Sequence, residues 1–274
     1  MVMETAFTAV AARFDNRTAL VTGAGGDIGA TVAVLLAQSG ARVVLTDLDA
    51  SVDSTADACA AANPGLEPIV VRCDVTSEDE VGRAVDEIGA AGIVADLLFN
   101  NAGIQGSFDN VVDQDASGFR RVLDTNVTGV FLVLRGFARA LLSTGRPGAV
   151  VNTASMAQGG APNMAAYSAS KAAVVALTKT AAKDLAPASI RVNSVSPAFI
   201  GPGAMWDRQV ALQAETPSQY FSDEPDEVAA QMIGSVPLRR YGSLDEVAAA
   251  VLFLLSDESS YITGFDLQVS GGAV

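Results

Sequence analysis

A chain of 274 residues is long enough to bury a full core within one α/β domain. Its formal net charge of −14 repels nucleic acid and anionic membrane surfaces, so we expect neither as a partner. The sequence contains no histidine, and its only cysteines, Cys59 and Cys73, form neither a metal-type spacing nor a disulfide framework. We therefore expect no metal site built from histidine or paired cysteine ligands, and a reducing compartment.

The first residues do not resemble a secretion signal, because Glu4 stands where such a signal is basic and no long apolar region follows. No apolar run approaches the ~18 residues that a membrane span requires. The sequence therefore predicts a cytoplasmic protein without a membrane segment.

Short apolar runs alternate with helical stretches along the chain. The runs are near-continuous, which is typical of strands that helices cover on both faces. The predicted strands are Thr18–Thr22, Arg42–Thr46, Pro68–Arg72, Asp96–Asn100, Ala149–Thr153, Arg191–Val195 and Asp266–Val269. The predicted helices lie near 28–39, 51–62, 77–90, 113–143, 165–186 and 244–256. This succession predicts an α/β fold, a doubly wound parallel sheet that binds ligands at the carboxyl ends of its strands.

Residues 201–237 are the one long departure from this alternation, and Asp and Pro residues punctuate them. We interpret them as a substrate-facing lid rather than a separate domain, because long loops in compact domains are usually functional. The whole chain, 1–274, is then a single domain.

The first predicted strand ends in a glycine-rich turn that opens a helix, Thr22-Gly23-Ala24-Gly25-Gly26-Asp27-Ile28-Gly29. Glycines let the backbone approach a pyrophosphate, and the helix N-terminus supplies amides and the positive end of a dipole. A turn with only a structural role is the alternative, which the strand–turn–helix context disfavours. The turn therefore predicts a dinucleotide site.

Asp47 closes the second predicted strand, followed by the apolar Leu48. A carboxylate at this position can bind both adenosine ribose hydroxyls and repels a 2′-phosphate. The alternative is an aspartate that only caps a turn. We expect the cofactor to be NAD rather than NADP.

Tyr167 and Lys171 are four residues apart and share one face of a predicted helix. A phenol titrates near pH ~10, and an ammonium one turn away would lower that pKa toward neutrality. Ser155 follows the fifth predicted strand and can hold a substrate oxygen beside the phenol. Since the chain lacks histidine, Tyr167 is the candidate acid/base.

In this order along the chain, the motifs resemble those of the short-chain dehydrogenase/reductase family in its single-domain subtype. The likeness extends from Ala19 to Gly272. The motifs that carry it are the turn at 22–29, Cys73-Asp74-Val75, Asn100-Asn101-Ala102-Gly103, Asn126, Ser155, and Tyr167 with Lys171.

The resemblance implies a role for each matching residue. Tyr167 would be the acid/base, with Ser155 orienting the substrate oxygen. Lys171 would bind the nicotinamide ribose and lower the tyrosine pKa, and Asn126 would hold a water that carries the proton to solvent. Taken singly, Asn126 can also be a polar kink in a helix, and Ser155 can simply end a strand.

The resemblance also implies a set of cofactor contacts along the groove. Asp74 and Val75 would flank the adenine, and Asn100 would sit under the adenosine half. The full set is Gly23, Gly26, Asp27, Ile28, Asp47, Leu48, Asp74, Val75, Asn100, Ala102, Gly103, Tyr167, Lys171, Pro197 and Ile200.

The chain departs from the family pattern in places. Asp27 replaces the middle glycine of the turn, Ala198 stands where glycine is frequent, and Gly201 replaces a frequent threonine. Ser155 and Tyr167 are one residue closer than in many members, which predicts a tighter loop between them. An aspartate at a helix start can cap free amides, yet its charge lies near the pyrophosphate.

The segment after residue 200 is similar to the corresponding part of bacterial NAD-dependent xylitol dehydrogenases, for example at Gly201-Pro202-Gly203 and Met205-Trp206. Amide side chains can bind several hydroxyls, and such a pocket rejects analogues that lack them. We expect substrate contacts from Ser155, Gln105, Gln158, Met205 and Trp206. The alternative for Met205 and Trp206 is that they only pack within the lid.

These features predict an NAD-dependent dehydrogenase of a secondary alcohol, such as the polyol xylitol. The first alternative is a dehydrogenase of an apolar cyclic alcohol or diol, of steroid or terpene type. A 3-oxoacyl reductase is disfavoured by Asp47 and the acidic surface, and a non-catalytic NAD-binding protein by the intact Ser155, Tyr167 and Lys171. Family members usually pair the helices at 113–143 and 165–186 between subunits, so we expect a homotetramer.

Overall fold

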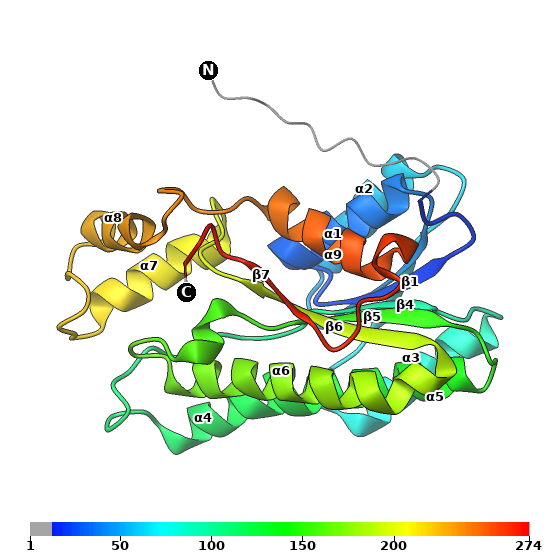
Figure 1. Cartoon of the computed structure of the whole chain (residues 1–274), viewed down its shortest axis with the longest axis horizontal. Helices are drawn as coiled ribbons and strands as arrows, with labels where there is room; N and C mark the ends of the chain where they lie inside the picture. The colour runs from blue at the N-terminus through cyan, green and yellow to red at the C-terminus, as the bar shows by residue number, and fades with distance from the viewer. Residues whose placement is uncertain (1–12, 274) are drawn as a thin grey trace.

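A computed structural model describes residues 13–273, and its centre is a seven-stranded parallel sheet (Figure 1). The strand order is β3-β2-β1-β4-β5-β6-β7, so the direction of winding reverses between β1 and β4. A reversal of this kind leaves a crevice at the carboxyl ends of the strands. The strands are β1 (Thr18–Thr22), β2 (Arg42–Asp47), β3 (Ile69–Arg72), β4 (Leu97–Asn100), β5 (Gly148–Thr153), β6 (Ile190–Pro197) and β7 (Asp266–Val269).

Helices cover both faces of the sheet, which confirms the predicted doubly wound architecture (Figure 1). One face packs against α1 (Asp27–Gln38), α2 (Val52–Ala62) and α9 (Leu244–Leu255). The other packs against α3 (Glu78–Ala90), α5 (Val130–Leu142) and α6 (Ala165–Leu185), with α4 (Ala116–Leu123) against α6.

Two apolar rows cross the sheet, because successive strand residues point to opposite faces. Leu20 stands level with Val44, and both pack in the core beneath α5 and α6. Val21 stands level with Leu45 and Phe99 in the core beneath α1 and α9. Both rows are apolar, so the strands read as near-continuous apolar runs, and all seven were predicted.

The predicted helix over 113–143 is wrong in detail. It begins at Ala116, where the Asp115 side chain accepts the Gly118 amide at 2.7 Å as an N-cap. A π-helical turn, η1 (Asp124–Gly129), then separates α4 from α5. A Cβ on Gly129 would lie 2.9 Å from Val75 Cγ2. The helix therefore packs closely at this turn against the loop that follows β3.

The continuous stretch Ala116–Leu142 is 27 residues long, and by length and composition it is apolar enough to cross a membrane. It is not an uninterrupted apolar run, because Asp124 and Arg135 lie within it. Half of its most apolar window is buried inside the protein, and Val133 and Phe137 belong to the core beneath the sheet. Burial of this kind is what a core helix of the fold requires.

Residues 201–237 contain two helices that were not predicted, α7 (Ala204–Glu215) and α8 (Pro225–Ser235). They lie beyond one end of the sheet (Figure 1). Trp206 and Val210 of α7 pack against Val228 and Met232 of α8 in a small core of their own. The predicted absence of a starting signal peptide concerns residues outside the described range, 13–273.

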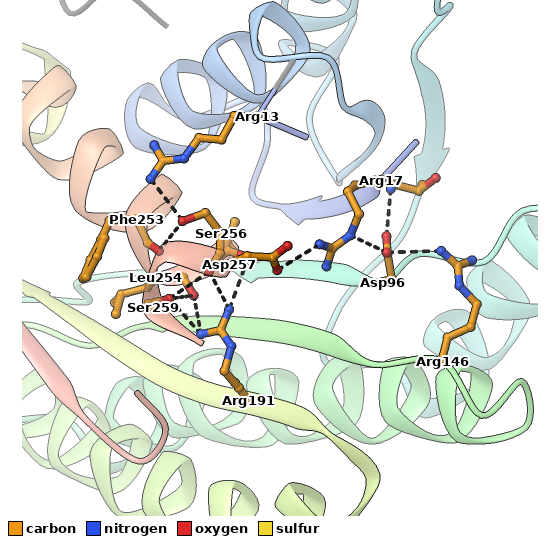
Figure 2. Close-up of polar contacts among 12 residues, drawn as sticks. Arg13, Arg17, Asp96, Arg146, Arg191, Phe253, Leu254, Ser256, Asp257 and Ser259 are labelled. Carbon is orange, nitrogen blue, oxygen red and sulfur yellow. Dashed lines mark hydrogen bonds and ion pairs between the residues drawn. The ribbon is translucent and has the colours of Figure 1, made fainter. Parts of the chain in front are cut away.

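The carboxyl end of α9 is capped by a guanidinium from β6. Arg191 Nη1 donates to the Leu254 carbonyl at 2.8 Å and to Ser259 Oγ at 2.9 Å, and Nη2 donates to the Ser256 carbonyl at 2.9 Å (Figure 2). These carbonyls have no partner within the helix, so a cation here satisfies them and complements the helix dipole. The contact fixes α9 to the sheet.

Arg191→Met is expected to lower the free energy of unfolding by about 2–3 kcal/mol, because several hydrogen bonds from a charged donor are lost and only Ser259 still donates to the Leu254 and Ser256 carbonyls. Urea denaturation at fixed protein concentration measures it. Arg146→Met is the matched control, since Arg146 is 43% exposed and makes one ion pair, with Asp96 at 3.2 Å. Equal losses in the two variants would contradict the cap.

Candidate active site

A cavity of about 1050 Å³ opens at the carboxyl ends of β1 to β6. Its size is at the upper end of the range for ligand sites. Most of the predicted site residues line it, although they come from all parts of the chain. These are Gly23, Gly26, Asp27, Ile28, Asp47, Leu48, Asp74, Val75, Ala102, Gly103, Gln105, Ser155, Tyr167, Lys171, Pro197, Ile200, Met205 and Trp206.

The glycine-rich turn has no room for side chains at the glycines that pack against the rest of the protein. It has room at Gly26, which lines the cavity. A Cβ on Gly29 would lie 2.1 Å from the Gly23 carbonyl oxygen, and one on Gly25 would lie 2.2 Å from Ser51 Oγ. At Gly26 the nearest atom, the Gly23 oxygen, is 3.6 Å away. An open backbone at the N-terminus of α1 fits the pyrophosphate of a dinucleotide.

Asp47 ends β2 beside this turn. Its Oδ2 accepts the Gly25 amide at 2.8 Å, and its Oδ1 accepts the Asp49 amide at 3.1 Å. The neighbouring Leu48 side chain is exposed and lines the cavity. A fixed carboxylate with an apolar neighbour favours ribose hydroxyls over a 2′-phosphate.

Asp27 is the first residue of α1 and lines the cavity, and its Oδ2 lies 2.9 Å from where a Cβ on Gly203 would stand. Asp27→Gly is expected to leave NAD affinity unchanged or to tighten it, because a negative charge beside the pyrophosphate is removed. Titration calorimetry with NAD measures the effect. A large loss of affinity would instead identify Asp27 as a positive contact.

Tyr167 and Lys171 project from consecutive turns of α6 toward the end of β5. The Lys171 ammonium is buried, donates to the Thr153 carbonyl at 2.7 Å and lies 5.5 Å from the centre of the Tyr167 ring. Ser155 Oγ accepts the Ala157 amide at 3.2 Å and donates to the Pro197 carbonyl at 3.4 Å. The fold therefore brings three of the four predicted catalytic side chains to one wall of the cavity.

Burial dominates the titration of both groups. It lowers the pKa of Lys171 from 10.5 to about 8. Burial also raises the pKa of Tyr167, and the Ser155 hydroxyl lowers it by less. This corrects the predicted downward shift of the tyrosine pKa in the free protein, because the loss of hydration of the buried phenolate outweighs the hydrogen bond from Ser155.

Because the Tyr167 pKa is raised, its phenolate is scarce at neutral pH. Alcohol oxidation needs the phenolate as its base, so its rate is expected to increase as the pH rises. We expect kcat/KM for oxidation to increase about tenfold per pH unit between pH 6 and 8. Above about 8, Lys171 loses its charge and the rise becomes shallower. Initial rates from pH 6 to 10 measure the profile, and a profile flat below pH 8 would contradict it.

Two predicted residues, Asn100 and Asn126, lie behind or beside the cavity wall. Asn100 Nδ2 donates to the Val130 carbonyl at 2.9 Å and joins β4 to α5. Asn126, within η1, accepts the Ile104 amide at 2.8 Å and donates to Ser170 Oγ at 3.0 Å. A Cβ on Gly103 would lie 3.0 Å from Asn126 Oδ1, so Asn126 is close to the cavity without lining it.

Gln158 is the predicted substrate contact that the structure places elsewhere. Its amide nitrogen donates to Asp266 Oδ2 at 2.7 Å and to Ser196 Oγ at 3.0 Å, so it joins the short helix Met156–Gly159 to β7 and β6. The side chain is directed to the sheet edge rather than to the cavity. Its partner Asp266 is 108 residues away in sequence.

Asn101 also lines the cavity, although no role was predicted for it. Asn101 Nδ2 donates to the Thr22 and Gly23 carbonyls at 3.2 and 3.3 Å, and its Oδ1 accepts from Thr153 Oγ1 at 3.1 Å. It therefore ties the glycine turn to the strand before Ser155. Its position inside the Asn100–Gly103 motif was the available signal.

The comparison with a family model decides the classification: the model described as enoyl-(acyl carrier protein) reductase matches residues 23–274. The chain belongs to the short-chain dehydrogenase/reductase family. This confirms the predicted family. As a short-chain dehydrogenase/reductase, the protein is an oxidoreductase of alcohols and ketones.

Relatives within the short-chain dehydrogenases/reductases differ in the substrates that their names give. The crystal structure of NAD⁺-bound xylitol dehydrogenase is 49% identical, with a TM-score of 0.91 over 94% of this chain and 99% of that one. Cis-4-hydroxycyclohexanecarboxylate dehydrogenase of Sinomonas cyclohexanicum is 37% identical over 94% of this chain and 97% of its own. Secoisolariciresinol dehydrogenase of Forsythia intermedia is 35% identical over 97% and 91%.

Proposed function

We propose that the protein is an NAD-dependent dehydrogenase that interconverts a polyol such as xylitol and the corresponding ketone. The observation that carries the proposal is one cavity that joins the glycine turn and Asp47 to Ser155, Tyr167 and Lys171. The similarity to NAD⁺-bound xylitol dehydrogenase supports both the cofactor and the polyol. Gln105 and Gln209 give the substrate end an amide wall that suits hydroxyl groups.

In this mechanism the chain orients the alcohol and moves its proton. NAD, held by the turn and by Asp47, supplies the hydride acceptor when it is bound. The Tyr167 phenolate takes the proton of the reacting hydroxyl, and Ser155 donates a hydrogen bond to the same oxygen. The Lys171 ammonium stabilises the phenolate by its charge. The Asn126 side chain is bonded to Ile104 and Ser170, so it supports the wall beside Lys171 rather than lining the cavity.

The lid supplies the outer wall of the proposed substrate pocket. Trp206 packs between Phe199 and Tyr241, with ring centres 6.1 and 5.6 Å apart, and this anchors the first turn of α7. Met205 beside it is exposed and lines the cavity. The region 201–237 thereby closes over the substrate and excludes water.

A second candidate, a dehydrogenase of an apolar cyclic alcohol, is favoured by the thioether lining of the same cavity. Met156, Met164 and Met205 all contribute to the wall. Methionine adapts its shape to varied apolar ligands. Relatives named for cyclohexane-type substrates agree with this alternative.

Initial-rate oxidation of xylitol, ribitol, arabinitol, sorbitol and cyclohexanol, with NAD and NADP in parallel, tests the proposal. Selective turnover of xylitol with NAD is the expected result. Turnover of cyclohexanol alone would establish the second candidate. No turnover of any alcohol, with NAD still bound, would overturn both.

We propose a homotetrameric assembly in the cytoplasm. Phe131 and Leu142 are exposed on α5, and Tyr261 and Phe265 are exposed at the approach to β7. Large apolar side chains on two separate faces suit two different subunit contacts. Light scattering tests the assembly, and a mass near one subunit of 28.0 kDa would refute it.

A further inference from the structure

One face of α7 in the lid carries polar side chains that bind two segments of the main body. Gln213 Oε1 accepts from Asn163 Nδ2 at 3.0 Å, and Thr216 Oγ1 donates to the Phe108 carbonyl at 2.8 Å. Gln209, four residues before Gln213, is on the same face. Gln209 Oε1 accepts from Gln105 Nε2 at 3.3 Å.

The pair Gln105–Gln209 differs from the bonds of Gln213 and Thr216 because both of its residues line the cavity. Arg208 Nη2, which donates to the Gly106 carbonyl at 3.2 Å, joins the same two walls. Gln105 is buried, and its Oε1 has no hydrogen-bond partner among the described residues. Turning both amides over keeps the bond between them and leaves Gln105 Nε2 without a partner instead, so one polar atom of this buried amide is unpaired in either arrangement. A buried acceptor without a partner costs about 1–3 kcal/mol. Such a cost is expected where a ligand supplies the missing partner.

We infer that the Gln105–Gln209 pair recognises a hydroxyl group of the substrate other than the one that is oxidised. A hydroxyl fits both ends of the pair, because it donates to Gln105 Oε1 and accepts from Gln209 Nε2. Since one amide belongs to the body and the other to α7, the same hydroxyl also ties the lid to the pocket. The inference rests on the proposed polyol dehydrogenase function and assigns its specificity to these two residues.

An apolar substrate leaves the Gln105 oxygen unpaired, whereas a polyol pairs it. Sites built to bind a hydroxyl reject analogues that lack it, because their own buried groups then stay unsatisfied. The pair therefore selects polyhydroxy alcohols over monohydroxy alcohols of similar size. Neither amide touches the reacting oxygen in this scheme, so both are specificity residues.

The test compares wild type with Gln105→Met and Gln209→Met, which keep the length of the side chain and remove its amide. The substrates are xylitol and its monodeoxy analogues, with NAD. Wild type is expected to lose about tenfold in kcat/KM on one analogue, the value of one neutral hydrogen bond. Gln105→Met is expected to lose about the same on xylitol and nothing further on that analogue.

Gln213→Met is the matched control. It removes the hydrogen bond between α7 and Asn163, and Gln213 is buried but does not line the cavity. Its ratio between xylitol and the analogue is expected to equal that of wild type. Equal losses on every substrate in Gln105→Met, or the same change of ratio in Gln213→Met, would overturn the inference while polyol turnover stands. A protein that oxidises no polyol overturns the proposed function and this inference together.

Discussion

Tyr167→Phe is expected to lower kcat for alcohol oxidation about 1000-fold, the typical contribution of a positioned acid/base. The ring and its contact with Lys171 remain, so the loss isolates the phenol oxygen. With no histidine in the chain, no commoner proton acceptor can replace it. Steady-state kinetics with the best alcohol of the panel measure the effect.

Binding of NAD to Tyr167→Phe, followed by calorimetry, is expected to stay within about threefold of wild type, which separates chemistry from folding. Tyr220→Phe is the matched control, since Tyr220 is exposed in the lid and does not line the cavity. Full activity in Tyr167→Phe would end the catalytic assignment of Ser155, Tyr167 and Lys171 as a group.

Asp47→Asn is expected to shift the ratio of kcat/KM for NAD over NADP by about 100-fold toward NADP. Two charges ~4 Å apart interact by about 4 kcal/mol near a protein surface, and screening removes part of that. Asparagine keeps an oxygen for the Gly25 amide, so the turn stays in place. The variant therefore removes the repulsion of a 2′-phosphate, together with the weaker bond from the Asp49 amide, which an amide nitrogen cannot accept.

Asp53→Asn is the control for the change of net charge. Asp53 lies on α2, is exposed, pairs with Arg72 at 2.8 Å and does not line the cavity. Its cofactor ratio is expected to match that of wild type. A shift as large as that of Asp47→Asn would show that overall charge, rather than the position of Asp47, sets the preference.

The parallel sheet could be predicted because helices cover both of its faces, so side chains on either face of a strand are apolar. Leu20 packs in the core on one face, and its neighbour Val21 packs in the core on the other. Position in sequence also sufficed for Tyr167 and Lys171, since a helix fixes their spacing. In both cases a local rule determines the outcome.

Features that depend on distant partners could not be predicted in the same way. The π-helical turn η1 ends where Gly129 meets Val75, a contact between elements far apart in the chain. The helices α7 and α8 bury few apolar residues, and these pack mainly on each other. From its position three residues after Ser155, Gln158 was predicted to line the pocket. Its actual partner, Asp266, is far away in sequence and could not be inferred from that position.

The lid leaves and rejoins the body of the protein at a single point. The Gly201 amide donates to the Gly242 carbonyl at 3.0 Å, and the Gly242 amide donates to the Phe199 carbonyl at 2.9 Å. The two ends of this segment are hydrogen-bonded to each other, and its helices share a small core of their own. It therefore forms a compact unit on the body of the protein. Because the glycine turn and Asp47 lie outside this segment, its sequence can vary without changing those residues of the dinucleotide half.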